Sequence, residues 1–165
     1  FITLRDFFSK GFKNLAQNTA HFGFSLLILS ILFNSLFSSE IITNLKVGQT
    51  FENTKAKIVF ESLSQKEGEN YKSIIGNFIV QDSKGKIENL SPELRIYNQP
   101  NIATSEADIK TTLLSDKFMV INIVQNQDFF NVRYQVKPFM LWIWLSVILI
   151  SLGGMISFIK KEYEK

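Results

Sequence analysis

The sequence predicts a membrane protein of the α-plus-β class, in which two transmembrane helices flank an extracytoplasmic, antiparallel, β-rich domain of about 100 residues. Three observations predict this class. Two long segments are strongly apolar, the stretch between them alternates short apolar runs with turn signals, and basic residues gather outside the two apolar segments. The mean hydropathy of the 165-residue chain is +0.08, which fits such a mixture of apolar segments and one polar domain.

The first transmembrane helix is predicted over residues 15–37. From residue 20 onward this segment has no charge unless His21 is protonated, and residues 15–19 bring it to the roughly 20 residues that cross a hydrocarbon core. A buried helix of a globular domain is the alternative, but such a helix usually carries a polar face. Residues 1–14 mix apolar and basic side chains, so they form either a cytoplasmic, interfacial amphipathic helix or the tail of a preceding loop.

The second transmembrane helix is predicted over residues 138–159, which contain no charged residue. Pro138 suits the first turn of a helix, and Trp142 and Trp144 suit the boundary between lipid and water. One stripe of this helix consists of Ser146, Ile150, Gly153 and Ser157. Because small residues at this spacing let backbones come close, we expect another helix to pack against the stripe.

Basic residues outnumber acidic ones on both flanks. Residues 1–14 hold three basic residues against one acid, and the tail, residues 160–165, holds three against two. The positive-inside rule therefore places both ends in the cytoplasm or the mitochondrial matrix. The central domain, residues 38–137, then lies in the periplasm or the intermembrane space. Its 12 basic and 12 acidic residues cancel, which argues against nucleic-acid binding.

Five segments of the central domain are rich in Ile, Val, Phe and Tyr and are predicted to be strands. They are residues 57–63, 71–80, 94–97, 117–124 and 129–136. Turn signals occur between several of them, at residues 66–70, 82–85 and 125–128. This spacing predicts a small antiparallel sheet that is partly closed or sandwich-like.

The residue inventory excludes several kinds of chemistry. The chain contains no cysteine, which excludes disulfides, thiolate metal sites and a cysteine nucleophile within it, and one histidine cannot build a multi-histidine zinc site. The central domain has no histidine, so no Ser–His–Asp arrangement can form there. Glu106 and Asp108 are close in sequence, and we expect this pair to be solvated rather than catalytic. We assign no catalytic residue and expect the central domain to bind partners.

The position of His21 in the sequence indicates a functional role. An ionisable side chain in an apolar span is costly to bury unless a partner satisfies it. A neutral imidazole can be an axial ligand of haem iron, and Gly23 and Ser25 would leave room for a flat macrocycle if they share its face. The alternative is an interfacial histidine that hydrogen-bonds to a neighbouring helix.

Four short elements follow one another along the chain. They are A-H-F-G at residues 20–23, S-P-E-L-R-I-Y at 91–97, A-T-S-E-A at 103–107, and V-K-P-F-M-L-W-I-W-L at 136–145 with S-L-G-G at 151–154. In order and spacing they resemble the carboxy-terminal portion of the CcmF family, the membrane haem lyases of cytochrome c maturation. Ser146 departs from the glycine expected there. The tryptophan-rich haem-handling loop and the other histidines of the family are absent.

The resemblance implies the function. The chain would be the carboxy-terminal part of a haem lyase that attaches haem to apocytochrome c, and His21 would bind the iron of a membrane haem b. The implied partners are the remainder of the CcmF-like protein, a haem chaperone, apocytochrome c, other maturation subunits and the lipid bilayer. Because Phe1 opens the sequence, we expect a piece of a longer protein, from either a split gene or a truncated sequence. The alternative is a non-enzymatic, membrane-anchored docking subunit of a transport or assembly complex.

Overall fold

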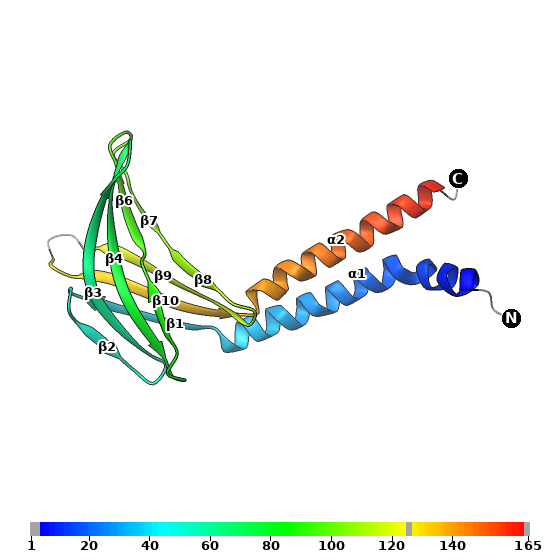
Figure 1. Ribbon diagram of the computed structural model, residues 1–165, viewed down its shortest axis with the longest axis horizontal. Coiled ribbons are helices and arrows are strands. Elements are labelled where there is room, and N and C mark those ends of the chain that lie inside the picture. The colour runs from blue at the N-terminus through cyan, green and yellow to red at the C-terminus, as the bar shows by residue number, and fades with distance from the viewer. Residues whose placement is uncertain (1–3, 125–126, 164–165) are drawn as a thin grey trace. The chain divides into compact units, whose positions relative to one another are not determined.

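The computed structural model describes residues 4–124 and 127–163, and the side chains of residues 15–124 and 127–158 (Figure 1). The chain divides into two compact units. A helical unit contains Phe1–Ser38, Thr112–Ser115 and Lys137–Lys165, and a β-sandwich unit contains Ser39–Thr111 and Asp116–Val136. Each unit has its own packing, and we describe them separately.

The helical unit consists of two long helices that run side by side in opposite directions, α1 (Leu4–Phe37) and α2 (Met140–Tyr163). Both are long and apolar enough to cross a membrane, over Leu15–Phe37 and Met140–Phe158. Helix α1 begins at Leu4, so the opening stretch is helical from that residue. Residues 1–3 lie outside the described part of the chain.

Small residues let the two helices pack closely. A Cβ atom added to Gly153 of α2 would lie 2.7 Å from the Ala20 nitrogen and 2.8 Å from the Ala16 oxygen of α1. Ser30 of α1 and Ser146 of α2 are fully buried. The predicted packing stripe is therefore present at Ser146 and Gly153, whereas Ser157, at its end, is exposed.

The start of α2 differs from the sequence prediction. Phe139 has a φ of 59°, a left-handed conformation that a right-handed helix cannot include. The helix therefore begins at Met140, and Pro138 ends the preceding strand rather than lying in the first helical turn. The Asn34 amide of α1 donates a hydrogen bond of 2.6 Å to the Pro138 carbonyl oxygen. This bond ties the end of α1 to the start of α2.

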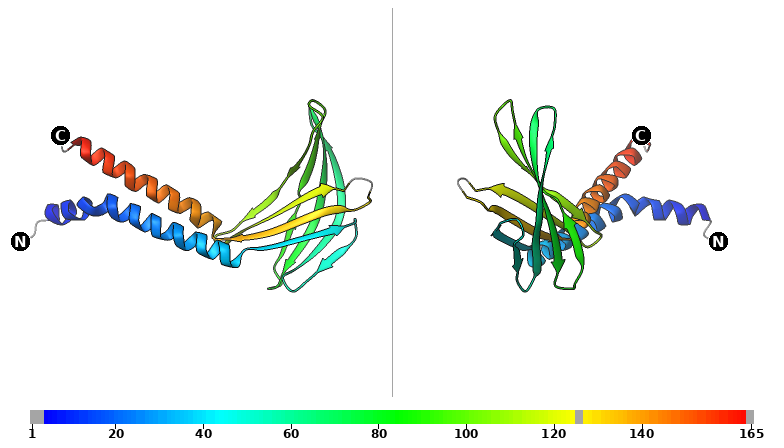
Figure 2. Two further views of the ribbon diagram at one scale, coloured as in Figure 1. Left: turned by 180° about the vertical axis from the view of Figure 1, so that it is seen from behind. Right: turned by 60° about the vertical axis from the view of Figure 1, so that its left-hand side comes forward.

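The central domain is a sandwich of two antiparallel sheets, which Figure 2 shows from two further directions. One sheet has the order β1 (Ser39–Leu45), β10 (Phe130–Pro138), β9 (Ser115–Ile123), β8 (Asp108–Thr111). The other has the order β2 (Thr50–Glu52), β3 (Ala56–Glu67), β4 (Tyr71–Asp82), β6 (Glu93–Tyr97), β7 (Ala103–Glu106), and β5 (Ile87–Leu90) also pairs with β4. The predicted fold class, two apolar helices that flank a β-rich domain, is confirmed.

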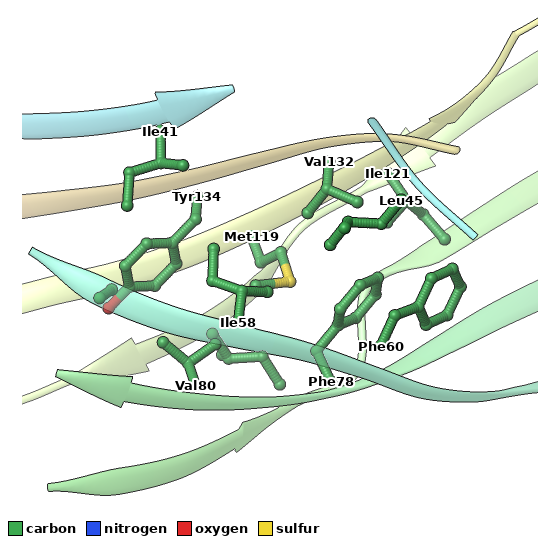
Figure 3. Close-up of a cluster of buried hydrophobic side chains, with 12 residues drawn as sticks. Ile41, Leu45, Ile58, Phe60, Phe78, Val80, Met119, Ile121, Val132 and Tyr134 are labelled. Atoms are coloured by element: carbon green, nitrogen blue, oxygen red, sulfur yellow. The ribbon is translucent and has the colours of Figure 1, made fainter. Parts of the chain in front are cut away.

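Alternating side chains from both sheets fill the core of the sandwich (Figure 3). The buried cluster contains Ile41, Leu45, Ala56, Ile58, Phe60, Phe78, Val80, Leu90, Met119, Ile121, Val132 and Tyr134. At its centre the rings of Phe60 and Phe78 stack with centroids 4.3 Å apart, and Phe130 meets Phe60 edge-on at 5.7 Å. Ring contacts of this kind add to the hydrophobic gain and fix how the two sheets face each other.

All five predicted strands are present, and within the described residues the structure adds β1, β2, β5, β7 and β8, which the sequence did not reveal. The predicted turn at residues 82–85 is also present. There the Asp82 carboxylate accepts bonds of 2.9 Å from the backbone nitrogens of Lys84 and Lys86, and Gly85 has a φ of 80°. Residues 125–126 of another predicted turn lie outside the described part of the chain.

Candidate functional site

His21 lies on a side of α1 that α2 does not cover. The preceding residue, Ala20, contacts Gly153 of α2, and a Cβ atom added to Gly23 would lie 3.0 Å from Ile150. Because residues on a helix are about 100° apart, His21 points away from this contact side, and its side chain is exposed. The imidazole is therefore left uncovered by the side chains that the structure describes.

A short polar stripe surrounds His21. Ser25 stands one turn later on the same face and is exposed, as are Gln17 and Asn18 one turn earlier. Of the two residues that would leave room beside the imidazole if they share its face, Gly23 packs against α2 and does not meet this condition, whereas Ser25 does. Sequence reasoning missed Gln17 and Asn18, although their spacing of four and three residues from His21 was the available signal.

Two of the short sequence elements come together on one face of the β4–β6–β7 sheet. Along β6, Leu94 is buried on the inner face of the sheet. Glu93, Arg95 and Tyr97 alternate with it and therefore lie on the outer face. On β7, Thr104 pairs with Arg95 and Glu106 pairs with Glu93, so both side chains share the outer face. We call the outer-face set Tyr71, Ser73, Glu93, Arg95, Tyr97, Thr104 and Glu106 the motif face.

Polar contacts hold the motif face together. Glu93 accepts hydrogen bonds of 3.0 Å from the Ser73 hydroxyl and from Arg95 Nε. The Arg95 guanidinium lies 5.0 Å from the centre of the Tyr71 ring, whose centroid is 5.5 Å from that of Tyr97. The bond to Glu93, with a further one to Tyr97, raises the pKa of Arg95. The motif face is a preorganised surface that carries two carboxylates, Glu93 and Glu106, against one guanidinium, Arg95, and its chemistry suits recognition of a partner.

Glu106 and Asp108 do not act as a pair. They belong to strands of different sheets, β7 and β8. Asp108 accepts a 2.6 Å bond from the backbone nitrogen of Ser91, and the Glu106 carboxylate lies 3.5 Å from the Thr104 hydroxyl. Asp108 thus stabilises the backbone at Ser91, whereas Glu106 belongs to the motif face. Within the described residues no group of three His, Cys, Asp or Glu side chains could hold a metal ion.

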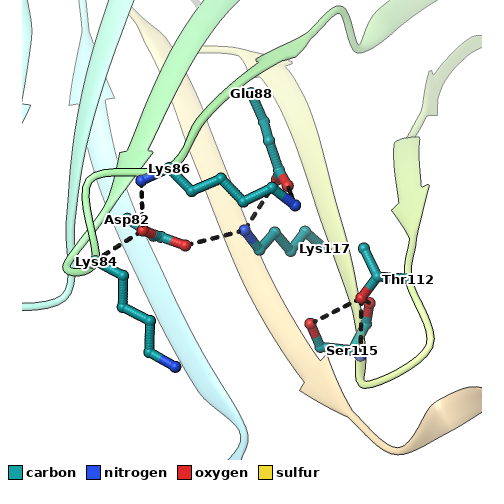
Figure 4. A network of polar contacts seen from close by, with 7 residues as sticks. All are labelled: Asp82, Lys84, Lys86, Glu88, Thr112, Ser115 and Lys117. Carbon is teal, nitrogen blue, oxygen red and sulfur yellow. Dashed lines mark hydrogen bonds and ion pairs between the residues drawn. The ribbon is translucent and has the colours of Figure 1, made fainter.

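A buried lysine connects the two sheets of the sandwich (Figure 4). Lys117 Nζ of β9 lies 3.0 Å from a Glu88 carboxylate oxygen and 3.4 Å from an Asp82 carboxylate oxygen, and Lys86 Nζ lies 2.7 Å from Glu88. Burial alone would raise the pKa of Asp82 and of Glu88. The backbone nitrogens of Lys84 and Lys86 at Asp82, and the two lysine side chains, outweigh burial, so both pKa values are lowered.

These features define a class of protein: an antiparallel β-sandwich bounded by two helices of membrane-spanning length, with one open histidine on the first. The family model described as the CcmF C-terminal beta-sandwich matches residues 36–138. The chain therefore belongs to the CcmF family.

Individual relatives agree with this assignment. The cytochrome c-type biogenesis protein CcmF of Pseudomonas aeruginosa is 28% identical over 145 residues, which cover 88% of this chain and 22% of that protein. The cytochrome c-type biogenesis protein ccl1 of Rhodobacter capsulatus is 30% identical over 145 residues, again 88% and 22%. CcmF of Haemophilus influenzae is 27% identical over 169 residues, 98% and 26%. The chain thus spans about a quarter or less of the length of these relatives.

A solved structure shares the fold. The structure titled "Cytochrome c Heme Lyase CcmF" matches with a TM-score of 0.70 and 16% sequence identity, over 89% of this chain and 25% of that one. At this identity the match supports the fold alone.

Proposed function

We propose that this chain is the carboxy-terminal part of a membrane haem lyase that takes part in attaching haem to apocytochrome c during cytochrome c maturation. The observation that supports it is the match of the sandwich to the CcmF family over residues 36–138, together with relatives named for cytochrome c biogenesis.

In this proposal His21 is an axial ligand of a membrane haem b. The donor fits, because a neutral imidazole is a common haem ligand and this one is exposed on the side of α1 away from α2. At about 1.5 Å per residue, His21 lies about 9 Å along the helix from Leu15, where the candidate span begins. The bound group would supply electrons that keep the incoming haem reduced. The second ligand would come from the remainder of the CcmF-like protein, since the chain has a single histidine.

The membrane arrangement is part of the proposal. Helices α1 and α2 cross an inner membrane, both ends of the chain are cytoplasmic or in the matrix, and the sandwich lies in the periplasm or intermembrane space. There the sandwich docks apocytochrome c, the haem chaperone or other maturation subunits. The motif face is its best-organised surface for this purpose, because its charged groups are held in place by their own neighbours before any partner binds.

The test is a His21→Ala substitution in the full-length protein that contains this chain. We expect the absorbance of a haem with two histidine ligands to disappear from the purified protein, because one axial ligand is lost. Asn18→Ala and Ser25→Ala are matched controls on the same exposed stripe, and both should keep the spectrum. An unchanged haem content in the His21→Ala protein would refute the ligand assignment. Maturation of cytochrome c that proceeds without this chain would refute the wider proposal.

A further inference from the structure

The tip of the β8–β9 hairpin presents two exposed leucines on a rigid turn. The Thr112 nitrogen and hydroxyl donate bonds of 3.0 Å and 2.7 Å to the Ser115 carbonyl oxygen, and the Ser115 nitrogen donates a bond of 3.1 Å to the Thr112 hydroxyl. The Thr112 and Ser115 side chains are drawn in Figure 4. Between them, Leu113 and Leu114 are 64% and 61% exposed. Two large apolar side chains exposed on a turn whose backbone is held by these hydrogen bonds indicate an interaction site.

This tip belongs to the helical unit rather than to the sandwich. The indole nitrogen of Trp142 donates a 2.9 Å hydrogen bond to the Leu113 carbonyl oxygen, and the Phe139 nitrogen donates one of 2.8 Å to the Leu114 carbonyl oxygen. Both bonds join the turn to the start of α2, where Figure 1 shows the hairpin tip. The two leucines are therefore fixed beside the end of the helix pair at which α1 ends and α2 begins.

Charged residues, Lys110 and Asp116, flank the tip along the chain, but large apolar side chains are exposed at the same end of the helix pair. Exposed large apolar side chains at this end are Leu36, Phe37, Leu141 and Trp144. The turn itself, Thr112–Ser115, contains no charged residue. Exposed large apolar side chains gathered at one place mark an interaction site, and their position at the end of two helices of membrane-spanning length points to lipid as the partner.

We propose that Leu113 and Leu114 insert into the outer boundary of the lipid bilayer and form a third membrane contact of this chain, beside α1 and α2. The inference rests on the proposed membrane crossing of the two helices. The bond from Trp142 makes the insertion specific, because an indole at the boundary between lipid and water offers its N–H to a polar group while its ring stays among apolar groups. In this case the polar group is the carbonyl oxygen of the residue that enters the lipid.

The chain offers a clean labelling experiment because it contains no cysteine. Three single variants, Leu114→Cys, Ile148→Cys and Ile87→Cys, are labelled with a polarity-sensitive fluorophore and reconstituted into phosphatidylcholine vesicles with brominated acyl chains. Ile148 lies within the candidate span of α2, and Ile87 of the sandwich is 61% exposed, which matches the exposure of Leu114. We expect bromine quenching at residues 114 and 148, and none at residue 87.

The outcomes separate the two proposals. Quenching at residue 148 without quenching at residue 114 overturns the lipid contact and leaves the membrane crossing intact. A blue-shifted but unquenched label at residue 114 also overturns it, since protein, such as a second copy of this chain, would then cover the tip. No quenching at either position refutes the membrane crossing itself. In the Trp142→Phe background, which keeps an aromatic ring but removes the N–H donor, quenching at residue 114 should fall by at least half while that at residue 148 is unchanged.

Discussion

Lys117 shows how one buried charge can join two sheets. Its side chain is 9% exposed, and it lies between two carboxylates of the opposite sheet, on Asp82 and Glu88. An isolated ammonium group at such a position would be costly, but two partners with lowered pKa values balance it. The sequence carried a signal for this position. Lys117 has the same strand parity as the core residues Met119 and Ile121, so it had to face inward.

Replacing Lys117 with Met should destabilise the sandwich by about 2 kcal/mol near neutral pH, because it leaves two partly buried carboxylates without their shared cation. The lowered pKa values of Asp82 and Glu88 mean that this stabilisation is present above the unfolded-state values, about 4, and is lost as the pH falls through the folded-state values. The difference between wild type and Lys117→Met should therefore shrink on acidification. Urea unfolding of the detergent-solubilised chain, followed by far-ultraviolet circular dichroism at several pH values, measures it.

Lys72→Met is the matched control for this change. Lys72 forms a 3.7 Å ion pair with Glu67, but its side chain is 70% exposed, so its loss should change the free energy of unfolding by less than about 0.5 kcal/mol. Equal effects of the two substitutions, or a Lys117 effect that persists at low pH, would show that the inter-sheet ion pairs do not stabilise the fold.

At the scale of elements, the contact between α1 and α2 depends on residues without large side chains. Gly153 faces the backbone of Ala16 and Ala20, and Ser30 and Ser146 are buried between the helices. In lipid, two apolar helices gain little from hydrophobicity when they associate, so close packing has to hold them together. The small residues of α2 at helical spacing were readable in the sequence. Their partners on α1 were not, because no pattern within one helix specifies the register of another.

A Gly153→Val substitution should push the two helices apart. Its Cβ atom would lie 2.7–2.8 Å from Ala16 and Ala20 atoms, two of them backbone atoms that cannot rotate away. With cysteines introduced at the exposed Gln17 and Met155 and spin-labelled, pulsed electron paramagnetic resonance should show a longer or broader interhelix distance distribution. The matched control is Gly154→Val, where an added Cβ has no neighbour within 4 Å. An interhelix distance distribution that Gly153→Val leaves unchanged, or that both variants change equally, would contradict close packing between α1 and α2.

The strands divide into those that the sequence could predict and those that it could not. The five predicted strands contain most of the buried Ile, Val and Phe residues, so their apolar runs stand out. Strand β7, Ala103–Glu106, has no such run and exists because β6 offers it a pairing edge. The motif face needs this pairing, since it places Thr104 and Glu106 beside Arg95 and Glu93. Its members on β6 and β7 belong to short elements recognisable in the sequence, but their meeting with each other and with Tyr71 and Ser73 of β4 is a long-range result that local pattern does not contain.

At the scale of the whole molecule, the two units differ in how they bury their apolar residues. The sandwich has a buried apolar core of its own and only scattered exposed apolar residues such as Ile87, whereas the helices leave Phe22, Phe24, Ile28 and many similar residues exposed. A water-exposed surface of that kind would aggregate, so the helical unit requires lipid or further protein around it. The lone histidine in an apolar segment was visible in the sequence. Its exposed direction was not, because only the contact with α2 decides which side of α1 is free.

The proposed topology predicts different access to the two units from outside the membrane. In the cysteine-free chain, Ile87→Cys of the sandwich should react with a membrane-impermeant maleimide added to intact bacterial spheroplasts, whereas Lys160→Cys should react only after lysis. The physical reason is the basic excess on both flanks, which is retained on the cytoplasmic side, whereas a loop of about 100 residues is transferred largely regardless of its own charge. Labelling of residue 160 in intact spheroplasts would reverse the assigned orientation. Recovery of the chain in the soluble fraction would show instead that both helices are buried by protein.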